Sequence, residues 1–258
     1  ADTIPNRMVI SLAGKNALYK GDLMMLEMIA QCNWERPIYV ALTVGQENYM
    51  NLGDNFVQEG LANRITPFTT NLPGARNFDT EKTYRNVMYR YRYGGLSRRG
   101  IYIDETVMRM CYTHRRLMAQ LATQLIAEGK KEKALRVLQK AEQEIPYENV
   151  PVSYVTGGFD LGAGNEFARN YALLGQKGKA RQQIDAVWKS AEQYLGWYLS
   201  LEGARFQGST RDCLAQFYQM RQTVAITEMF DRSLAAKQRK QLESLMSLYH
   251  SKGGVFPE

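Results

Sequence analysis

The sequence contains few of the residues that most often carry catalysis or bind metals. Its 258 residues include only two histidines and three cysteines, and the cysteines, at positions 32, 111 and 213, show no CxxC spacing. Because widely separated cysteines of odd number do not make a disulfide framework, we predict free buried thiols. Cys111 and His114 fit on one helix face, yet two ligands are not a zinc site, and we expect His114 to pack in the core.

Long apolar runs are absent as well. The longest candidate, residues 23–30, is interrupted by Glu27 and is shorter than the roughly 20 residues that a membrane-spanning helix needs. The chain begins at Ala1 without a methionine and without the basic and apolar stretches of a secretion signal. We therefore expect a soluble segment that has been cut from a longer protein.

The glycines do not complete a nucleotide-binding motif. After Gly162 and Gly164, a dinucleotide fingerprint would need a glycine at position 167, where the sequence has Phe167. Asp104 and Glu105 are explained by the capping of a helix start, and no GxSxG motif accompanies either histidine. We therefore predict no cofactor, no metal and no catalytic residue, and we do not expect this segment to be an enzyme by itself.

The first third of the chain mixes helix and strand signals. Asp22 precedes apolar residues that repeat every three or four positions up to about Asn33, which predicts a helix. Pro37 opens the run 38–42, whose β-branched and aromatic residues predict a buried strand. A short helix at 49–58, a second strand at 61–68 and a loop at 71–79 are expected to follow. These elements predict a small α/β unit over residues 1–80.

From Asp104 onward the apolar residues repeat with the 3.6-residue period of a helix. They predict a long helix that stops at Gly129 and a second helix at 131–144, ended by Pro146. The buried face of the first helix is expected to contain Val107, Met110, Cys111, His114, Leu117, Leu121 and Leu125. Two helices joined by so short a turn form an antiparallel hairpin.

The hairpin pattern recurs along the chain. A shift of 46 residues places Ala122, Gly129, Lys133 and Ala134 on Ala168, Gly175, Lys179 and Ala180. In the first copy, the small, large, small and proline positions of the tetratricopeptide repeat are matched by Ala134, Leu138, Ala141 and Pro146. In the second copy, Tyr171 occupies the usual aromatic position of the first helix. Val187 and Glu192 replace the later small residue and the proline, so this copy is degenerate. We predict helical hairpins at about 105–146, 165–199 and 209–250.

The sequence therefore predicts an α+β fold that is mainly α. The small α/β unit at 1–80 is followed by a connecting segment at 81–104 and by a tetratricopeptide-like helical repeat array at 105–258. A segment at 147–164 is expected to be inserted between the first two hairpins, because their spacing exceeds the usual repeat of about 34 residues. Stacked hairpins form a concave face that usually holds extended peptides.

Positive charge is concentrated in one segment. The net charge is +7, and residues 84–99 contain five arginines and four tyrosines but no acid. Arginines interleaved with tyrosines suit nucleic acid, where guanidinium groups pair with phosphates and rings stack on bases. The alternation of residues 89–93 instead favours an extended segment with its tyrosines packed inward. We prefer a charged face or a partner-docking strip to nucleic-acid binding, with the candidates Arg90, Tyr91, Arg92, Arg98 and Arg99.

Several motifs together resemble a known family. They are NWERPIYVA at 33–41, EGL at 59–61 with Pro67, YGGL at 93–96, and the helix pair through 121–146. In combination they resemble the C-terminal region of multi-spanning membrane proteins similar to protein O-mannosyltransferases, over the chain up to about Val152. The resemblance implies a soluble domain that follows the last membrane span, tethered on the periplasmic or lumenal side. The family's catalytic carboxylate lies in the membrane half, and no residue here matches it.

The resemblance implies a non-catalytic domain that positions acceptor proteins or partners for protein O-glycosylation by its parent, an O-mannosyltransferase-like glycosyltransferase. The alternative is a structural scaffold that docks to its own membrane half, to partner proteins or to anionic lipid. Trp34 and Arg36 also have a structural explanation, since Trp34 can pack the end of the first helix and Arg36 can bond its last carbonyls. Outside the basic segment, the binding candidates are Trp34, Arg36, Tyr39, Asn165 and Tyr171.

Overall fold

The computed structural model describes residues 7–71, 77–152 and 163–256. The chain divides into two compact units, Ala1–Tyr91 and Arg92–Glu258. The division falls inside the segment 81–104 that the sequence predicts as a connection. Helices dominate the described residues, and the strands form a three-stranded antiparallel sheet near the N-terminus. The expected mixture of helix and strand, mainly helix, is confirmed.

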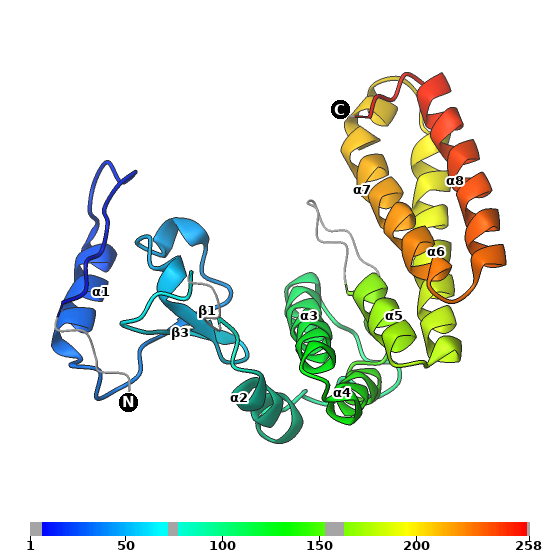
Figure 1. The fold of residues 1–258 in the computed structure, drawn as a ribbon. Coiled ribbons are helices and arrows are strands. Elements are labelled where there is room, and N and C mark those ends of the chain that lie inside the picture. The colour runs from blue at the N-terminus through cyan, green and yellow to red at the C-terminus, as the bar shows by residue number, and fades with distance from the viewer. Residues whose placement is uncertain (1–6, 72–76, 153–162, 257–258) are drawn as a thin grey trace. The chain divides into compact units, whose positions relative to one another are not determined.

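In the first unit, a helix packs on the small sheet (Figure 1). Helix α1 (Lys20–Gln31) starts where the Asp22 carboxylate accepts hydrogen bonds from the Tyr19 backbone N–H at 2.9 Å and from Lys15 Nζ at 2.7 Å. In the sheet, β3 (Ala62–Ile65) lies between β1 (Tyr39–Ala41) and β2 (Phe56–Gln58) and is antiparallel to both. The core between helix and sheet contains Ile29, Met50, Leu52, Phe56 and Ile65.

The prediction of a helix at 49–58 is wrong. In its place are two 3-10 turns, η1 (Gln46–Asn48) and η2 (Gly53–Asn55), followed by strand β2. Between the turns, Met50 and Asn51 have φ angles of 51° and 57°, in the left-handed region that a right-handed helix cannot contain. The Asn51 amide stabilises this conformation by donating to the carbonyls of Ser11 at 2.9 Å and Ala13 at 3.0 Å.

The extended conformation expected for residues 89–93 is wrong in its first part. Helix α2 (Thr80–Arg85) is capped by the Asp79 side chain and continues into a π-helical turn, η3 (Asn86–Arg90). Tyr84 and Val87 are buried, whereas Tyr89 is 64% exposed. Helical spacing therefore decides which side chains face the interior up to Arg90, whereas residues 91–93 follow the predicted alternation, with Arg92 exposed and Tyr93 buried.

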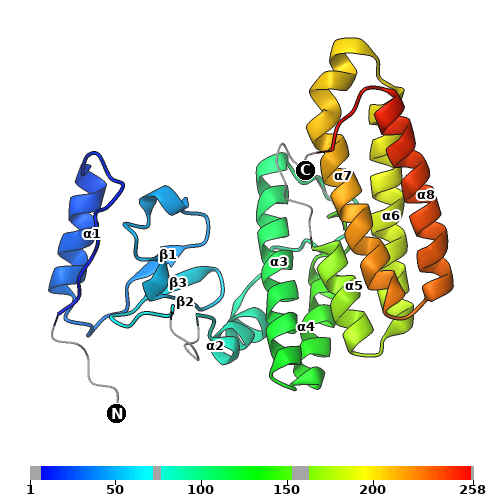
Figure 2. The ribbon, with the colours of Figure 1, turned by 45° about the horizontal axis from the view of Figure 1, so that its top comes forward.

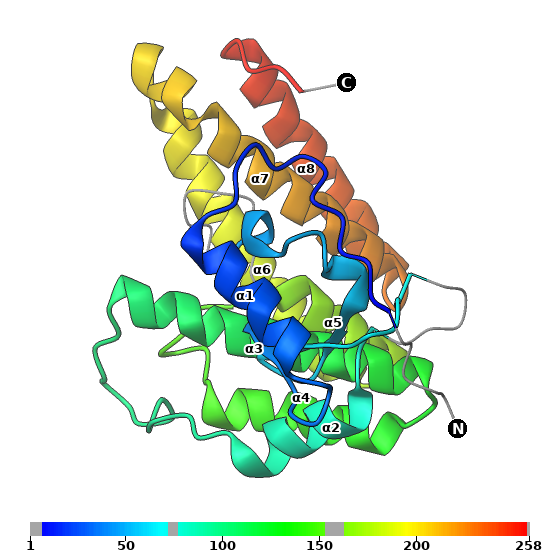
Figure 3. The same cartoon turned by 90° about the vertical axis from the view of Figure 1, so that its left-hand side faces the viewer.

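Three pairs of helices make up the described part of the second unit (Figure 2). They are α3 (Glu105–Ala127) with α4 (Lys131–Glu144), α5 (Gly164–Leu173) with α6 (Lys177–Ser200), and α7 (Gly203–Glu228) with α8 (Arg232–Ser251). Helix α5 contacts both α3 and α7, so the first helices of the three pairs pack side by side (Figure 3). Helix α7 begins before the predicted position 209, and most of the predicted insertion at 147–164 lies outside the described residues.

The first two pairs turn in the same way. Gly129 and Gly175 have φ angles of 75° and 74°. The residue after each glycine donates a backbone hydrogen bond of 2.8 Å back into the preceding helix, from Lys130 to Leu125 and from Gln176 to Tyr171. This is the left-handed glycine stop that ends many helices. The overlaid alanines are all fully buried, namely Ala122, Ala134, Ala168 and Ala180. Both copies of the pattern therefore have the same turn and the same small residues at close helix contacts.

The buried face predicted for α3 is correct only from Cys111 onward. Cys111, Leu117 and Leu121 are buried, whereas Val107 and Met110 are each 43% exposed. The period marks the apolar face of a helix, but it does not show how far along the helix a neighbour covers that face. The three cysteines are free, and Cys111 and Cys213 are buried as predicted, whereas Cys32 is only half-buried. None of the helices that the structure describes combines the length and the apolar composition that crossing a membrane requires.

A buried arginine fastens the segment that follows α4 to helix α3. Arg115 is 1% exposed, and its guanidinium donates to the carbonyls of Ile145 at 2.7 Å, Val150 at 2.8 Å and Pro151 at 2.7 Å. It also lies over the Tyr147 ring, 5.0 Å from the centroid. One side chain therefore donates to three carbonyls of this segment, of which the Pro151 carbonyl also accepts from the Tyr112 hydroxyl at 2.9 Å. The sequence gives no sign of this role, since Arg115 and Arg116 are adjacent and chemically alike.

Candidate functional site

A cavity of about 370 Å³ in the first unit brings together three of the predicted binding residues. Trp34, Arg36 and Tyr39 line it, together with side chains from β3 and α2. Trp34 lies in the turn after α1, where its φ angle is 58°, and it packs against the core beneath that helix as expected. The suggested bond from Arg36 to the end of α1 is wrong, because the Ile29 carbonyl there accepts from the Cys32 thiol at 3.2 Å and Arg36 lines the cavity.

Beside this cavity, a buried carboxylate organises two cations and a phenol. Glu59 is 4% exposed and accepts hydrogen bonds from Tyr39 Oη at 2.7 Å, Arg64 Nε at 2.6 Å and Lys82 Nζ at 2.5 Å. Burial by itself raises the pKa of Glu59, but the hydrogen bonds from Lys82, Tyr39 and Arg64 together hold it below its ordinary value. The hydrogen bond that Lys82 donates to Glu59 also raises the pKa of Lys82. Glu59 is therefore an anion that fixes three side chains in place.

The charge around the cavity favours an anion over a cation. Arg36, Arg64 and Lys82 line it, and the Glu59 carboxylate balances only part of that positive charge. Trp34 and Tyr39 add aromatic surface at the same site. Sequence reasoning found Trp34, Arg36 and Tyr39 because they are close together in the chain. It missed Glu59 and Lys82, which reach the site only through the pairing of β1 with β3 and the position of α2.

The division between the units separates the predicted basic strip into two parts. Arg90 and Tyr91 belong to the first unit, and Arg92, Arg98 and Arg99 belong to the second. Tyr91 is half-buried, and its hydroxyl accepts a hydrogen bond of 3.0 Å from the Leu61 backbone N–H, so it supports the turn between β2 and β3. The four arginines are exposed. The structure therefore gives Tyr91 a structural contact and leaves the arginines on the surface.

The second unit has a groove of about 510 Å³ between α5 and the end of α7. Its lining residues are Asn165, Glu166 and Arg169 from α5, with Gln222, Ala225, Ile226 and Met229 from α7 and its C-terminal cap. The wall therefore combines carboxylate, guanidinium and amide groups with apolar side chains. The groove lies on helices that are each the first of a pair.

Asn165, a predicted binding residue, connects the two walls of this groove. Its Nδ2 donates to the Gln219 carbonyl at 3.0 Å, and its Oδ1 accepts from the Thr223 hydroxyl at 2.8 Å. Next to it, burial raises the pKa of Glu166, even though the Thr123 hydroxyl donates to this carboxyl at 3.1 Å. Asn165 thus positions α5 against α7, while Glu166 presents a carboxyl group that is partly shielded from water.

Tyr171 lies in the interior of the second unit, and His114 is half-buried. Tyr171 is 1% exposed and burial raises its pKa, so its predicted binding role is replaced by a role in helix packing. His114 packs edge-on against the Tyr93 ring, with 5.5 Å between the ring centroids, and burial lowers its pKa. Across residues 7–71, 77–152 and 163–256, no three His, Cys, Asp or Glu side chains are grouped as metal binding requires.

Comparison with known proteins gives one informative match. Residues 1–82 match the model of a family described as TMEM260-associated domain 2. The matched segment contains α1, the three strands and the cavity residues Trp34, Arg36 and Tyr39. Neither a search of curated proteins nor a search of solved structures finds a match. Over residues 1–82 the chain is therefore similar to a domain associated with a membrane protein.

Proposed function

We propose that this chain is a non-catalytic domain of a membrane glycosyltransferase-like protein and that it positions acceptor proteins for protein O-glycosylation. The observation that carries the proposal is the groove between α5 and α7, which has the mixed lining that an extended polypeptide needs. The match of residues 1–82 to a membrane-protein-associated domain supports a membrane-bound parent. The resemblance of residues 33–41 to proteins similar to protein O-mannosyltransferases supports the reaction class and a periplasmic or lumenal location.

The position of the groove suits the capture of an extended chain. Helices α3, α5 and α7 pack side by side as the first helices of successive hairpins. In helical repeat proteins, stacked hairpins create an extended binding surface, and we interpret α3 to α6 as tetratricopeptide-like on this basis. The fully buried Ala134 and Leu138, together with Ala141, occupy the close-contact positions of that pattern.

The lining chemistry favours a polypeptide over a small charged ligand. Ala225, Ile226 and Met229 provide apolar contact, and Met229 is 48% exposed. Gln222 and Arg169 offer donors, and Glu166 offers an acceptor whose partial burial strengthens each hydrogen bond that it accepts. A peptide backbone needs both donors and acceptors along its length, with small pockets for side chains between them.

The test measures binding of the 258-residue chain to an array of unmodified peptides that contain serine and threonine. Ala225→Arg places a long charged side chain in the groove and should reduce peptide binding by about tenfold or more, equivalent to about 1.4 kcal/mol. Ala236→Arg, at an exposed position on α8 outside the groove, is the matched control and should bind as the unaltered chain does. Equal binding by both variants contradicts the proposal, as does the absence of binding to every peptide.

A second candidate function is a scaffold that docks on anionic lipid or on partner proteins. The observation that favours it is the exposure of Arg90, Arg92, Arg98 and Arg99. Clusters of exposed arginines attract acidic membranes by roughly 1 kcal/mol per residue near the surface, and salt weakens this attraction. Sedimentation with phosphatidylserine vesicles that is lost in high salt, and lost again when the four arginines are replaced by glutamine, supports this function. Absence of sedimentation at low salt excludes docking on lipid.

A further inference from the structure

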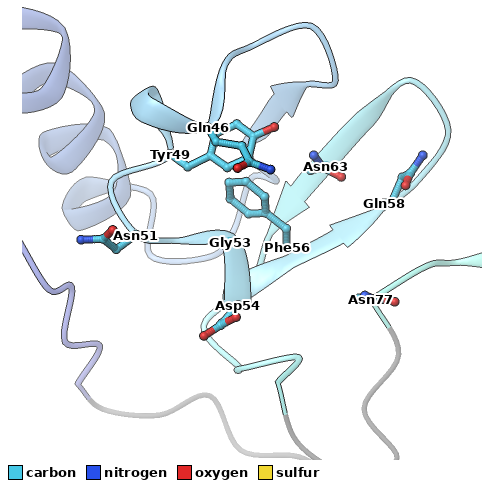
Figure 4. Close-up of a pocket in the computed structure, with 9 residues that line it drawn as sticks. All are labelled: Gln46, Tyr49, Asn51, Gly53, Asp54, Phe56, Gln58, Asn63 and Asn77. Atoms are coloured by element: carbon cyan, nitrogen blue, oxygen red, sulfur yellow. The ribbon is translucent and has the colours of Figure 1, made fainter. Parts of the chain in front are cut away.

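A second cavity of the first unit, of about 600 Å³, has a lining unlike that of the Trp34 cavity. Its wall on the sheet comes from β2 and β3, where Gln58 lies directly opposite Asn63. Phe56 lies two positions before Gln58 on the same strand, so the three side chains share one face of the sheet. Figure 4 shows Gln46 and Tyr49 from the turn beside this face, next to the Phe56 ring.

The turn that carries Gln46 and Tyr49 is held in place by its own contacts. The Tyr49 ring meets the Phe56 ring edge-on, with 5.0 Å between centroids and 68° between the planes. Met50 is 1% exposed, so its side chain anchors the turn in the core despite its positive φ angle. Backbone held in this region is maintained only where surrounding contacts fix it. The cavity is therefore shaped before a ligand arrives.

The functional groups of the cavity are mainly uncharged amides. Gln46, Asn51, Gln58, Asn63 and Asn77 line it, with Asp54 as its carboxylate, and none of the lining residues that the structure describes is an arginine or a lysine. Each amide both donates and accepts hydrogen bonds. An anion would need cationic partners, and a metal ion would need more oxygen ligands of negative charge than Asp54 supplies. Neutral ligands rich in hydroxyl groups, which also donate and accept, fit this set.

Two aromatic rings, those of Tyr49 and Phe56, also line the cavity and add apolar surface for a ligand rich in hydroxyl groups. Tyr49 is half-buried and Phe56 is 7% exposed, so the rings offer an apolar edge within a polar cavity. A pyranose ring has hydroxyl groups around its rim and C–H groups on its faces, and so it uses both kinds of surface at once. We propose that this cavity binds a neutral sugar, as a single pyranose unit or as the end of a glycan. The inference does not depend on the groove between α5 and α7.

The test titrates the isotope-labelled chain with the methyl glycosides of mannose, glucose and galactose and follows backbone amide shifts. Binding with a Kd of about 1 mM is expected for at least one of them, with shifts at residues 46–63. Gln46→Ala alters an exposed residue, and Asn63→Ala a half-buried one, and each should weaken binding by about fivefold through the loss of hydrogen bonds. Asn48→Ala, an exposed amide in the same turn but outside the lining, should bind unchanged.

Three results would overturn the proposal. They are no shift with any of the glycosides, equal binding by the Gln46→Ala and Asn48→Ala variants, and shifts at residues 46–63 caused by neutral peptides but not by sugars. Because Gln46 is exposed, its variant is expected to fold, and an unchanged amide spectrum without ligand verifies this. The sugar titration is independent of the peptide-binding test of the groove, since Ala225 lies in the other unit. A negative result in the peptide test therefore does not change what the sugar titration shows.

Discussion

Two buried charged side chains, Glu59 and Arg115, each hold together segments that are distant in the sequence. Glu59 joins β1, β3 and α2 through Tyr39, Arg64 and Lys82. Arg115 satisfies three backbone carbonyls of the segment after α4. Removal of a charged partner from a buried network leaves the other groups without hydrogen bonds, so substitution costs more than the intact network contributes.

Replacement of Arg115 by methionine should destabilise the second unit strongly. Methionine fills similar space but leaves the carbonyls of Ile145 and Val150 without the Arg115 donor, and the Pro151 carbonyl with the Tyr112 hydroxyl alone. We expect a loss of about 3 kcal/mol or more in the free energy of unfolding, measured by urea denaturation. Arg136→Ala, at an exposed position on α4, is the control and should change stability by less than about 0.5 kcal/mol. Similar small effects for both variants would show that Arg115 has no special role.

Replacement of Glu59 by glutamine should have an effect that depends on pH. The folded pKa of Glu59 is depressed, so its contribution to stability is complete above its ordinary value of 4.5 and is lost as pH falls through the lower folded value. We expect Glu59→Gln to cost roughly 1 to 3 kcal/mol at neutral pH. The difference from the unaltered chain should shrink below pH 4.5, as denaturation across a pH series would show. A difference that stays constant down to pH 3 would contradict the depressed pKa.

The sequence predicted part of the candidate site at the level of single residues. Trp34, Arg36 and Tyr39 lie within a few positions of one another, so a local motif was enough to find them. Glu59 and Lys82 were missed because only the folded sheet and α2 bring them to Tyr39. The polar cavity, with the amides of Gln46, Asn51, Gln58, Asn63 and Asn77, was missed for the same reason, since no local pattern distinguishes an amide in a pocket from one in solvent.

At the scale of elements, local signals succeeded where the chain is helical and regular. The stops at Gly129 and Gly175 and the period of the apolar residues are local features, and helices end at the expected places. The failures at 49–58 and in the first part of 89–93 have a common cause. In both segments the backbone follows tertiary contacts, through the left-handed turn at Met50 and through the burial of Val87, and short-range propensity does not report such contacts.

Glycine positions should respond to alanine substitution according to their φ angles. Gly129 ends α3 with a φ angle of 75°, which alanine adopts only with strain, so Gly129→Ala should destabilise the fold by about 1 kcal/mol. Gly178 lies in the first turn of α6 with open space around it, so Gly178→Ala should stabilise the fold by about 0.4 to 1 kcal/mol. Thermal unfolding of both variants checks the pair, and effects of the same sign would contradict it.

At the scale of the whole molecule, the two units have cores of different size. The core of the first unit contains Ile29, Met50, Leu52, Phe56 and Ile65. One core of the second unit alone contains twelve buried residues, and a further cluster surrounds Ala168. Since stability follows the apolar area that folding removes from water, we expect the first unit to unfold at lower urea concentration. Hydrogen exchange in rising urea should show loss of protection first in residues 7–71, and a simultaneous loss in both units would contradict this expectation.

The groove between α5 and α7 is proposed to position acceptor proteins for a membrane-bound parent. The most direct measurement compares acceptor glycosylation in cells that express the full parent protein, unaltered or with Ala225→Arg, with Ala236→Arg as the control. We expect Ala225→Arg to lower glycosylation about tenfold while the parent remains inserted at an unchanged level. Unchanged glycosylation in the Ala225→Arg cells, at equal amounts of inserted protein, would contradict the claim.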